Sequence, residues 1–110
     1  MHPLVTIICL CYNHKPFLQE ALDSVRNQTY PNLEIMVVDD ASTDGSAAWL
    51  ADYCRQHPQL KYIRHPQNTG NTRAFNEAFF LSAGEYIIDF ATDDVMLPER
   101  VAEQVKAFQD

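Results

Sequence analysis

The sequence predicts an α/β fold, with a mostly parallel sheet and helices on both of its faces. Short, β-branched apolar runs alternate with stretches whose apolar residues recur at helical spacing. Each strand and helix together take roughly thirty residues, which is the length of a right-handed βαβ crossover. The 110 residues are 46% apolar and 11% aromatic, enough for one hydrophobic core. We therefore expect a single domain over residues 1–110.

The first half of the chain contains two predicted strands and two predicted helices. The continuous apolar run from Val5 to Leu10 is the first strand. Pro16 suits the first turn of the next helix, which should end near Asn27. Leu33 to Val38 is the second strand, and capping residues then open a helix that His57-Pro58 closes. This order is typical of two consecutive strand–helix units.

The second half repeats the same pattern. Leu60 to Arg64 is a short third strand, and the third helix runs from Gly70 or Asn71 to Ser82. Tyr86 to Ala91 is the fourth strand, and Pro98 opens the last helix. No strand follows that helix, so we expect a truncated version of this architecture.

Two of the predicted strands end in a pair of carboxylates, Asp39-Asp40 and Asp93-Asp94. The carboxyl ends of parallel strands share the edge where ligands bind, and four acids there would repel one another without a cation. Mg²⁺ or Mn²⁺ shared with a diphosphate would satisfy them. The alternative is that these acids only cap helices and occupy solvated turns. Asp40 is the better candidate for a ligand contact, because Asp39 continues the strand and lies further inward.

Other candidate site residues are less specific. Tyr12 follows the first strand and could stack on a planar base, or its ring could simply pack on a helix. Arg73 could bind phosphate with its guanidinium fork, or pair with Glu77 one helical turn later. Four scattered histidines are interpreted as surface residues: His2, His14, His57 and His65.

Composition argues against several classes of function. The net charge of −7 and pI near 4.8 disfavour binding to a nucleic-acid backbone. No apolar run is long enough to span a bilayer, and the start does not resemble a secretory signal. We therefore expect a cytoplasmic protein, or one peripheral at the inner face of the membrane. The three cysteines predict buried thiols and no disulfide framework: Cys9, Cys11 and Cys54.

Five motifs, in order along almost the whole chain, resemble the nucleotide-binding half of family 2 glycosyltransferases of the GT-A fold. They comprise residues 5–13, 24–31, 37–46, 68–70 with Asn76, and 91–94. The resemblance implies a nucleotide-sugar donor, usually a UDP-sugar, and a bound Mn²⁺ or Mg²⁺ ion. It also implies that Tyr12 and Asp40 contact the base, Asp93 the ribose and Asp94 the metal.

The resemblance further implies an inverting transfer to a hydroxyl acceptor, such as a glycan in polysaccharide biosynthesis. Two positions depart from the family pattern: Leu10-Cys11 replaces a frequent Pro-Thr, and Ala91 replaces the first acid of the last motif. The general base of the family lies well beyond residue 110, so this chain supplies no catalytic residue and should be inactive alone.

Two alternatives and an association state complete these expectations. The same fold could serve as a non-catalytic nucleotide-binding or interaction module. A phosphoacceptor receiver domain is disfavoured, because it needs an acid pair after the first strand, where this chain has Cys11-Tyr12-Asn13. A sheet edge or face left uncovered could also produce a homo-oligomer.

Overall fold

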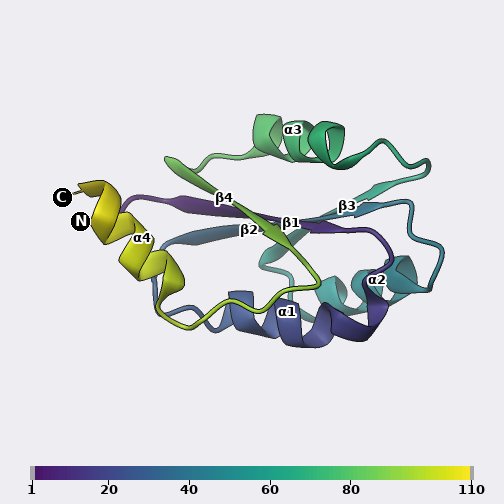
Figure 1. Cartoon of the computed structure of the whole chain (residues 1–110), viewed down its shortest axis with the longest axis horizontal. Helices are drawn as coiled ribbons and strands as arrows, with labels where there is room; N and C mark the ends of the chain where they lie inside the picture. The colour runs from purple at the N-terminus through teal and green to yellow at the C-terminus, as the bar shows by residue number, and fades with distance from the viewer. Residues whose placement is uncertain (1, 110) are drawn as a thin grey trace.

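The computed structural model describes residues 2–109 as one parallel sheet between two layers of helices (Figure 1). Within these residues, four strands and four α-helices alternate, with a 3-10 turn, Lys15–Phe17, ahead of the first helix. The strands are β1 Val5–Cys11, β2 Leu33–Asp40, β3 Leu60–His65 and β4 Tyr86–Ala91. The helices are α1 Leu18–Arg26, α2 Ser46–Gln56, α3 Asn71–Leu81 and α4 Arg100–Gln109. The predicted fold class is confirmed.

The strand order is β3-β2-β1-β4, and every pair is parallel. The crossover from β3 through α3 to β4 therefore passes over β2 and β1 to the far edge. As a result β1 lies at the centre, between the strands that carry the two acid pairs. This order determines which loops meet at the carboxyl end of the sheet.

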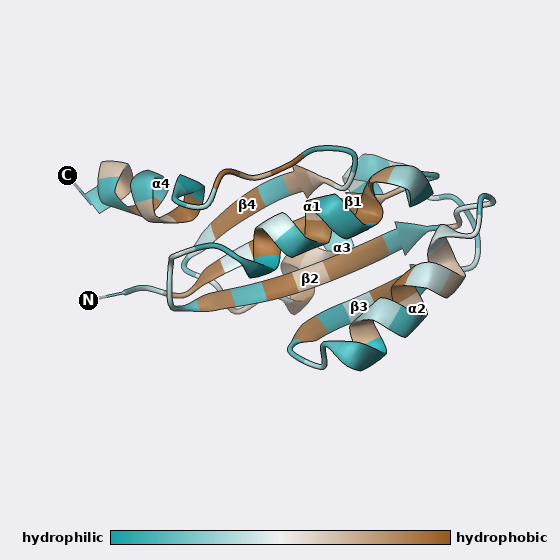
Figure 2. Cartoon of the chain, turned by 90° about the horizontal axis from the view of Figure 1, so that it is seen from below, coloured by the Kyte–Doolittle hydropathy of each residue, from teal (hydrophilic) through white to brown (hydrophobic). Residues whose placement is uncertain are grey.

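The helices divide between the two faces of the sheet. Val5, Ile7 and Cys9 of β1 point into a core shared with α1, α2 and α4. Ile8 and Leu10 point the other way, into a smaller core closed by Ala74 and Ala78 of α3. Figure 1 shows α3 alone on its side of the sheet. Figure 2 shows the apolar strands and the apolar stripes of the helices that cover them. The alternation along β1 follows from the period of two in a strand.

The predicted boundaries agree closely with these elements. The fourth strand matches end to end, while the first helix opens with the 3-10 turn and the last begins at Arg100, just after Pro98. Within residues 2–109, no helix has both the length and the apolar character required to span a bilayer.

Candidate functional site

The loops at the carboxyl ends of β1 and β2 are joined by hydrogen bonds. The Asn13 amide donates to Ser42 Oγ at 2.9 Å, and the Thr43 amide donates to Asn13 Oδ1 at 2.7 Å. Both Asn13 and Ala41 have positive φ angles, 59° and 63°, which non-glycine residues rarely adopt. The two loops therefore form one interlocked edge, with β1 at its centre.

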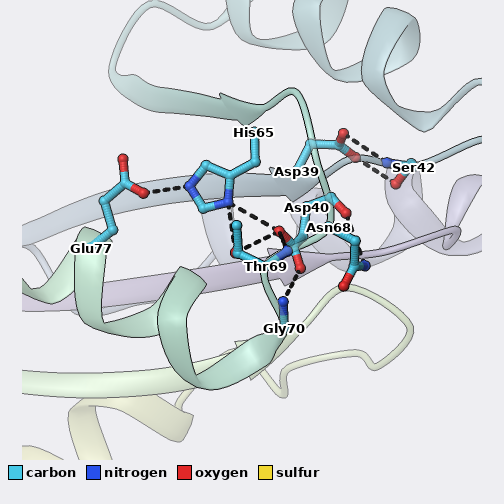
Figure 3. A network of polar contacts seen from close by, with 8 residues as sticks. All are labelled: Asp39, Asp40, Ser42, His65, Asn68, Thr69, Gly70 and Glu77. Carbon is cyan, nitrogen blue, oxygen red and sulfur yellow. Dashed lines mark hydrogen bonds and ion pairs between the residues drawn. The ribbon is translucent and has the colours of Figure 1, made fainter.

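The adjacent carboxylates of Asp39 and Asp40 have separate partners. The side chain of Asp39 is fully buried and accepts hydrogen bonds from the Ser42 hydroxyl at 2.5 Å and the Ser42 amide at 3.2 Å. Asp39 thus closes the turn after β2, as expected for the more inward of the two acids. Figure 3 shows Asp39 on the Ser42 side and Asp40 on the opposite side of the strand.

Asp40 is also buried, with an exposed fraction of 3%, and protein donors surround its carboxylate. Oδ1 accepts hydrogen bonds from the Thr69 amide at 2.9 Å and the Thr69 hydroxyl at 2.8 Å, and it contacts His65 Nδ1 at 3.0 Å. Oδ2 accepts one from the Gly70 amide at 2.8 Å. Burial alone would raise the pKa of Asp40, but the hydrogen bonds from Thr69, His65 and Gly70 lower it below its ordinary value.

His65 is buried, with an exposed fraction of 6%, so its interpretation as a surface residue was wrong. Its Nδ1 faces Asp40 and its Nε2 faces the carboxylate of Glu77 on α3. Burial lowers the pKa of His65, but the hydrogen bonds to the two carboxylates outweigh it and raise the pKa above its ordinary value. His65 is the register partner of Asp40 in the sheet, a relation that requires the strand pairing.

His14 also makes specific contacts within the site. Its Nδ1 lies 2.9 Å from Thr92 Oγ1, and its Nε2 lies 3.6 Å from Asp93 Oδ2. Thr92 is buried and donates to the carbonyl of Leu10 at 3.2 Å. His14 therefore connects the loop after β1 to the acid turn after β4, which the sequence did not predict.

The second acid pair, unlike the first, faces solvent. The side chain of Asp93 is 50% exposed, and Asp94 is exposed with its Oδ1 accepting a hydrogen bond from the Val95 amide at 2.8 Å. The Asp94 amide donates to the carbonyl of Ala91 at 3.1 Å, which folds the turn back onto the strand. Both carboxylates thus remain available to a ligand at the sheet edge.

The four acids do not form one cluster, so the expected convergence on a shared cation was wrong. Across residues 2–109, no group of three or more His, Cys, Asp and Glu side chains is arranged to hold a metal ion. Hydrogen-bond donors from Ser42, Thr69, Gly70 and His65 replace a cation at Asp39 and Asp40. The exposed Asp94 still fits a hard cation that takes its other oxygen ligands from a diphosphate and water.

A cavity of about 600 Å³ opens on the α3 side of the sheet, next to this edge. Tyr12, which is 42% exposed, and His14 line it together with the first turns of α3 and the ends of β1 and β4. Asp89 of β4 also lines it, a carboxylate whose role the sequence did not suggest. The sequence feature that could have indicated Asp89 is that it is a charged residue within an otherwise apolar strand.

Arg73 and Asp40 do not line this cavity. Arg73 is exposed on α3, and in the described part of the chain no ion pair joins it to Glu77, which contacts His65 instead. The alternative interpretation of Arg73 as a partner of Glu77 was therefore wrong. Its guanidinium is free to reach a ligand near the beginning of α3.

Comparisons with known proteins agree on one family. A family model described as glycosyl transferase family 2 matches residues 6–110. An uncharacterized glycosyltransferase of Haemophilus influenzae is 32% identical over 103 residues, which are 94% of this chain and 32% of that protein. The chain thus spans about a third of the length of this relative.

Solved structures show the same likeness. The mannosyltransferase PcManGT of Pyrobaculum calidifontis, in complex with GDP-Man and Mn²⁺, superposes with a TM-score of 0.90 at 34% identity, over 100% of this chain and 33% of that one. TarS 1-349 of S. aureus, in complex with UDP-GlcNAc, superposes with a TM-score of 0.83 at 26% identity, over 96% of this chain and 31% of that one.

Proposed function

Because the chain belongs to glycosyl transferase family 2 and has the GT-A fold, we propose that it is the donor-binding portion of an inverting glycosyltransferase. The donor is a nucleoside diphosphate sugar and the acceptor is a hydroxyl, such as that of a growing polysaccharide. The observation that carries this proposal is the pair of exposed carboxylates, Asp93 and Asp94, at the sheet edge beside the cavity that Tyr12 lines.

Each site residue then has a chemical role. The ring of Tyr12 stacks on the base, and the exposed carboxylate of Asp93 accepts hydrogen bonds from ribose hydroxyls. We propose that Asp40, although it is buried and does not line the cavity, contacts the base through Oδ2, which among residues 2–109 accepts one hydrogen bond, from the Gly70 amide. Arg73 extends its guanidinium to the phosphates. The proposed site therefore contacts the donor along its length, from the base to the diphosphate.

Mn²⁺ or Mg²⁺ held by Asp94 would neutralise the leaving diphosphate when bound. The residues of this chain hold and orient the donor, so that its anomeric carbon faces an acceptor hydroxyl. They include no general base, and we propose that this group comes from outside these 110 residues. The chain by itself would then bind a donor without transferring the sugar.

The nucleotide is proposed to be UDP. The similarity to TarS in complex with UDP-GlcNAc supports this choice. The similarity to PcManGT in complex with GDP-Man makes GDP the alternative nucleotide to test. Parallel titrations with UDP and GDP would separate the two, and tighter binding of GDP would overturn the choice of UDP.

Calorimetric titration with UDP, in the presence and absence of Mn²⁺, tests the donor site. We expect Mn²⁺ to increase the affinity of the wild type for UDP, and we expect this increase to be absent in Asp94→Ala. Asp52→Ala, which removes an exposed carboxylate from α2, is the matched control and should keep it. Metal-independent binding, or an unchanged metal effect in Asp94→Ala, would contradict the role of Asp94.

A non-catalytic nucleotide-binding or interaction module is the second candidate, and Ala91 in the first acid position of the motif favours it. It predicts UDP binding without sugar transfer in the longest native protein that contains this chain. Release of UDP that depends on an added acceptor would exclude this candidate.

We also propose that the protein works in the cytoplasm or at the inner face of the membrane, and that the chain self-associates. Exposed apolar side chains support association, among them Phe80 at 86% and Leu97 at 75%. Sedimentation velocity at several protein concentrations would reveal it, because association depends on concentration. A constant sedimentation coefficient would mean a monomer. Fractionation of cells that express the native protein tests its location.

A further inference from the structure

One buried histidine joins three separate segments of the chain behind the donor site. His65 ends β3, and its two ring nitrogens contact Asp40 of β2 and Glu77 of α3 (Figure 3). The loop between β3 and α3 closes over the same carboxylate, because both the Thr69 and Gly70 amides donate to Asp40. The Asn68 side chain adds a bond to the Asp40 carbonyl at 3.2 Å.

These contacts place the start of α3. Gly70 immediately precedes the helix, and its amide is held 2.8 Å from Asp40 Oδ2. The first turn of α3 contributes Asn71 and Thr72 to the wall of the cavity that also contains Tyr12. Because Glu77 lies further along the same helix, His65 and Asp40 secure α3 at two points. His65 is thus linked, through Asp40 and Gly70, to the helix turn that lines the cavity.

We propose that His65 is a positioning residue for donor binding, which in its protonated form holds the Asp40 carboxylate and the beginning of α3 in the binding geometry. The proposal rests on the proposed donor-binding function and adds a dependence of donor affinity on pH. His65 itself touches no ligand and acts through Asp40 and α3.

The chemistry of imidazole explains why the proton matters. Only the charged ring donates from both nitrogens, whereas the neutral ring has one donor and one acceptor. His65 faces a carboxylate at each nitrogen, Asp40 from β2 and Glu77 from α3, so the neutral ring leaves one of them without its hydrogen bond. The raised pKa of His65 agrees with this arrangement. We expect donor affinity to be highest below that pKa and to fall as the pH rises through it.

The test is a calorimetric titration of the protein with UDP and Mg²⁺ at intervals from about pH 6 to about pH 9, a range that brackets histidine ionisation. In the wild type, affinity should fall about tenfold with rising pH, the effect of losing one charge-assisted hydrogen bond. Glu77→Gln keeps a hydrogen-bonding partner but removes the charge, so the midpoint should move about one pH unit lower. A shift of the midpoint in Glu77→Gln therefore points to His65, whose Nε2 contacts that carboxylate.

Two histidine variants complete the design. His65→Asn places an amide nitrogen near the position of Nδ1, so it should retain the Asp40 contact and bind UDP with little dependence on pH. His57→Asn changes a histidine at the end of α2 and outside the site, so its UDP affinity should depend on pH as it does in the wild type. Thermal unfolding of each variant, measured in parallel, identifies any that fails to fold. If a histidine variant fails to fold, the shift of the pH midpoint in Glu77→Gln tests the proposal by itself.

The possible outcomes separate this inference from the function on which it rests. Binding of UDP by the wild type, with a midpoint that moves in Glu77→Gln, supports it. Equal UDP affinity at all pH values, or a midpoint unmoved by Glu77→Gln, overturns the role of His65 and leaves the donor site intact. A wild type that binds neither UDP nor GDP at any pH overturns the proposed function, and this inference with it.

Discussion

At the scale of single residues, neighbouring acids with the same chemistry play different parts. Asp39 closes a turn through Ser42, and Asp40 holds the loop before α3, while Asp93 and Asp94 remain exposed. What separates them is the supply of local donors: the loop amides that follow β2 and β3 face inward, whereas the turn after β4 opens to solvent. The same type of residue is thus structural in one turn and available to a ligand in another.

The linkage between protonation and folding predicts a pH-dependent loss of stability in His65→Ala. The pKa of His65 is raised in the folded state, so its stabilising contribution is complete below the ordinary histidine pKa and is lost as the pH rises through the folded value. At about pH 6 the free energy of unfolding of the variant should be about 3 kcal/mol lower than that of the wild type, the typical cost of breaking a buried ion pair. At about pH 9 it should lose less.

Urea denaturation at the two pH values measures this difference. The lowered pKa of Asp40 acts in the opposite direction: its contribution is present above the ordinary aspartate pKa and is lost as the pH falls through the folded value. Asp40 therefore contributes to the loss of stability on the acid side, together with Glu34 and Asp44, whose pKa values are also lowered, and His65 contributes to the loss as the pH rises. An equal loss in His65→Ala at both pH values would contradict the assignment.

At the scale of elements, close approach of the backbone at the beginning of β4 matters as much as apolar patterning. Gly84 precedes the strand, and its amide donates to Thr6 Oγ1 at 2.9 Å. The same hydroxyl donates to buried Glu34 at 2.7 Å, which in turn accepts a hydrogen bond from Lys61. One network thus joins β1, β2, β3 and the segment just before β4 at the amino ends of the strands, opposite to the site.

Gly84→Ala should destabilise the fold by about 3 kcal/mol, the upper range for overpacking. A Cβ at this position would collide with Thr6 Oγ1 and lie 2.6 Å from the Thr6 backbone nitrogen, so β1 or β4 must shift. Gly45→Ala is the matched control. It meets only the flexible end of Lys15, at 3.2 Å, and incurs left-handed backbone strain of about 1 kcal/mol. Chemical denaturation compares them, and equal losses would contradict the steric argument.

At the scale of the whole molecule, the larger core, on the side of α1, α2 and α4, encloses all three cysteines. Cys9, Cys11 and Cys54 are all buried and free, which confirms the prediction that they form no disulfide framework. Burial raises the pKa of all three thiols, that of Cys54 to about 11. None of them carries appreciable thiolate at neutral pH, so each acts as a small apolar core residue.

We therefore expect a thiol-specific disulfide reagent to modify the native protein at least about a hundredfold more slowly than a free cysteine, because reaction requires the thiolate and an open path to it. In concentrated guanidinium chloride all three thiols should react at once. Cys54→Ser should remove one equivalent from that total without accelerating the others. Rapid modification of any thiol in the native protein, followed by absorbance, would contradict the buried assignment.

Much of the fold could be read from the chain because its signals are local. The apolar run Tyr86 to Ala91 matches β4 end to end, and proline and glycine mark nearly every other boundary. The exposed acids Asp93 and Asp94, and Tyr12 at the cavity, were also accessible to sequence reasoning, since each follows a buried strand. The histidines were not, because the partners of His65 and His14 are distant in sequence.

The sequence by itself determined the alternation of strands and helices, the carboxyl edge as the location of the site, and the family through its ordered motifs. Only the tertiary structure decided which acids stay free. The order β3-β2-β1-β4 brings the 68–70 loop and His65 onto Asp40, and brings His14 onto the turn of Asp93. The physical reason is that a carboxylate's pKa, burial and remaining lone pairs depend on donors that arrive from other strands, and local sequence does not encode their distance.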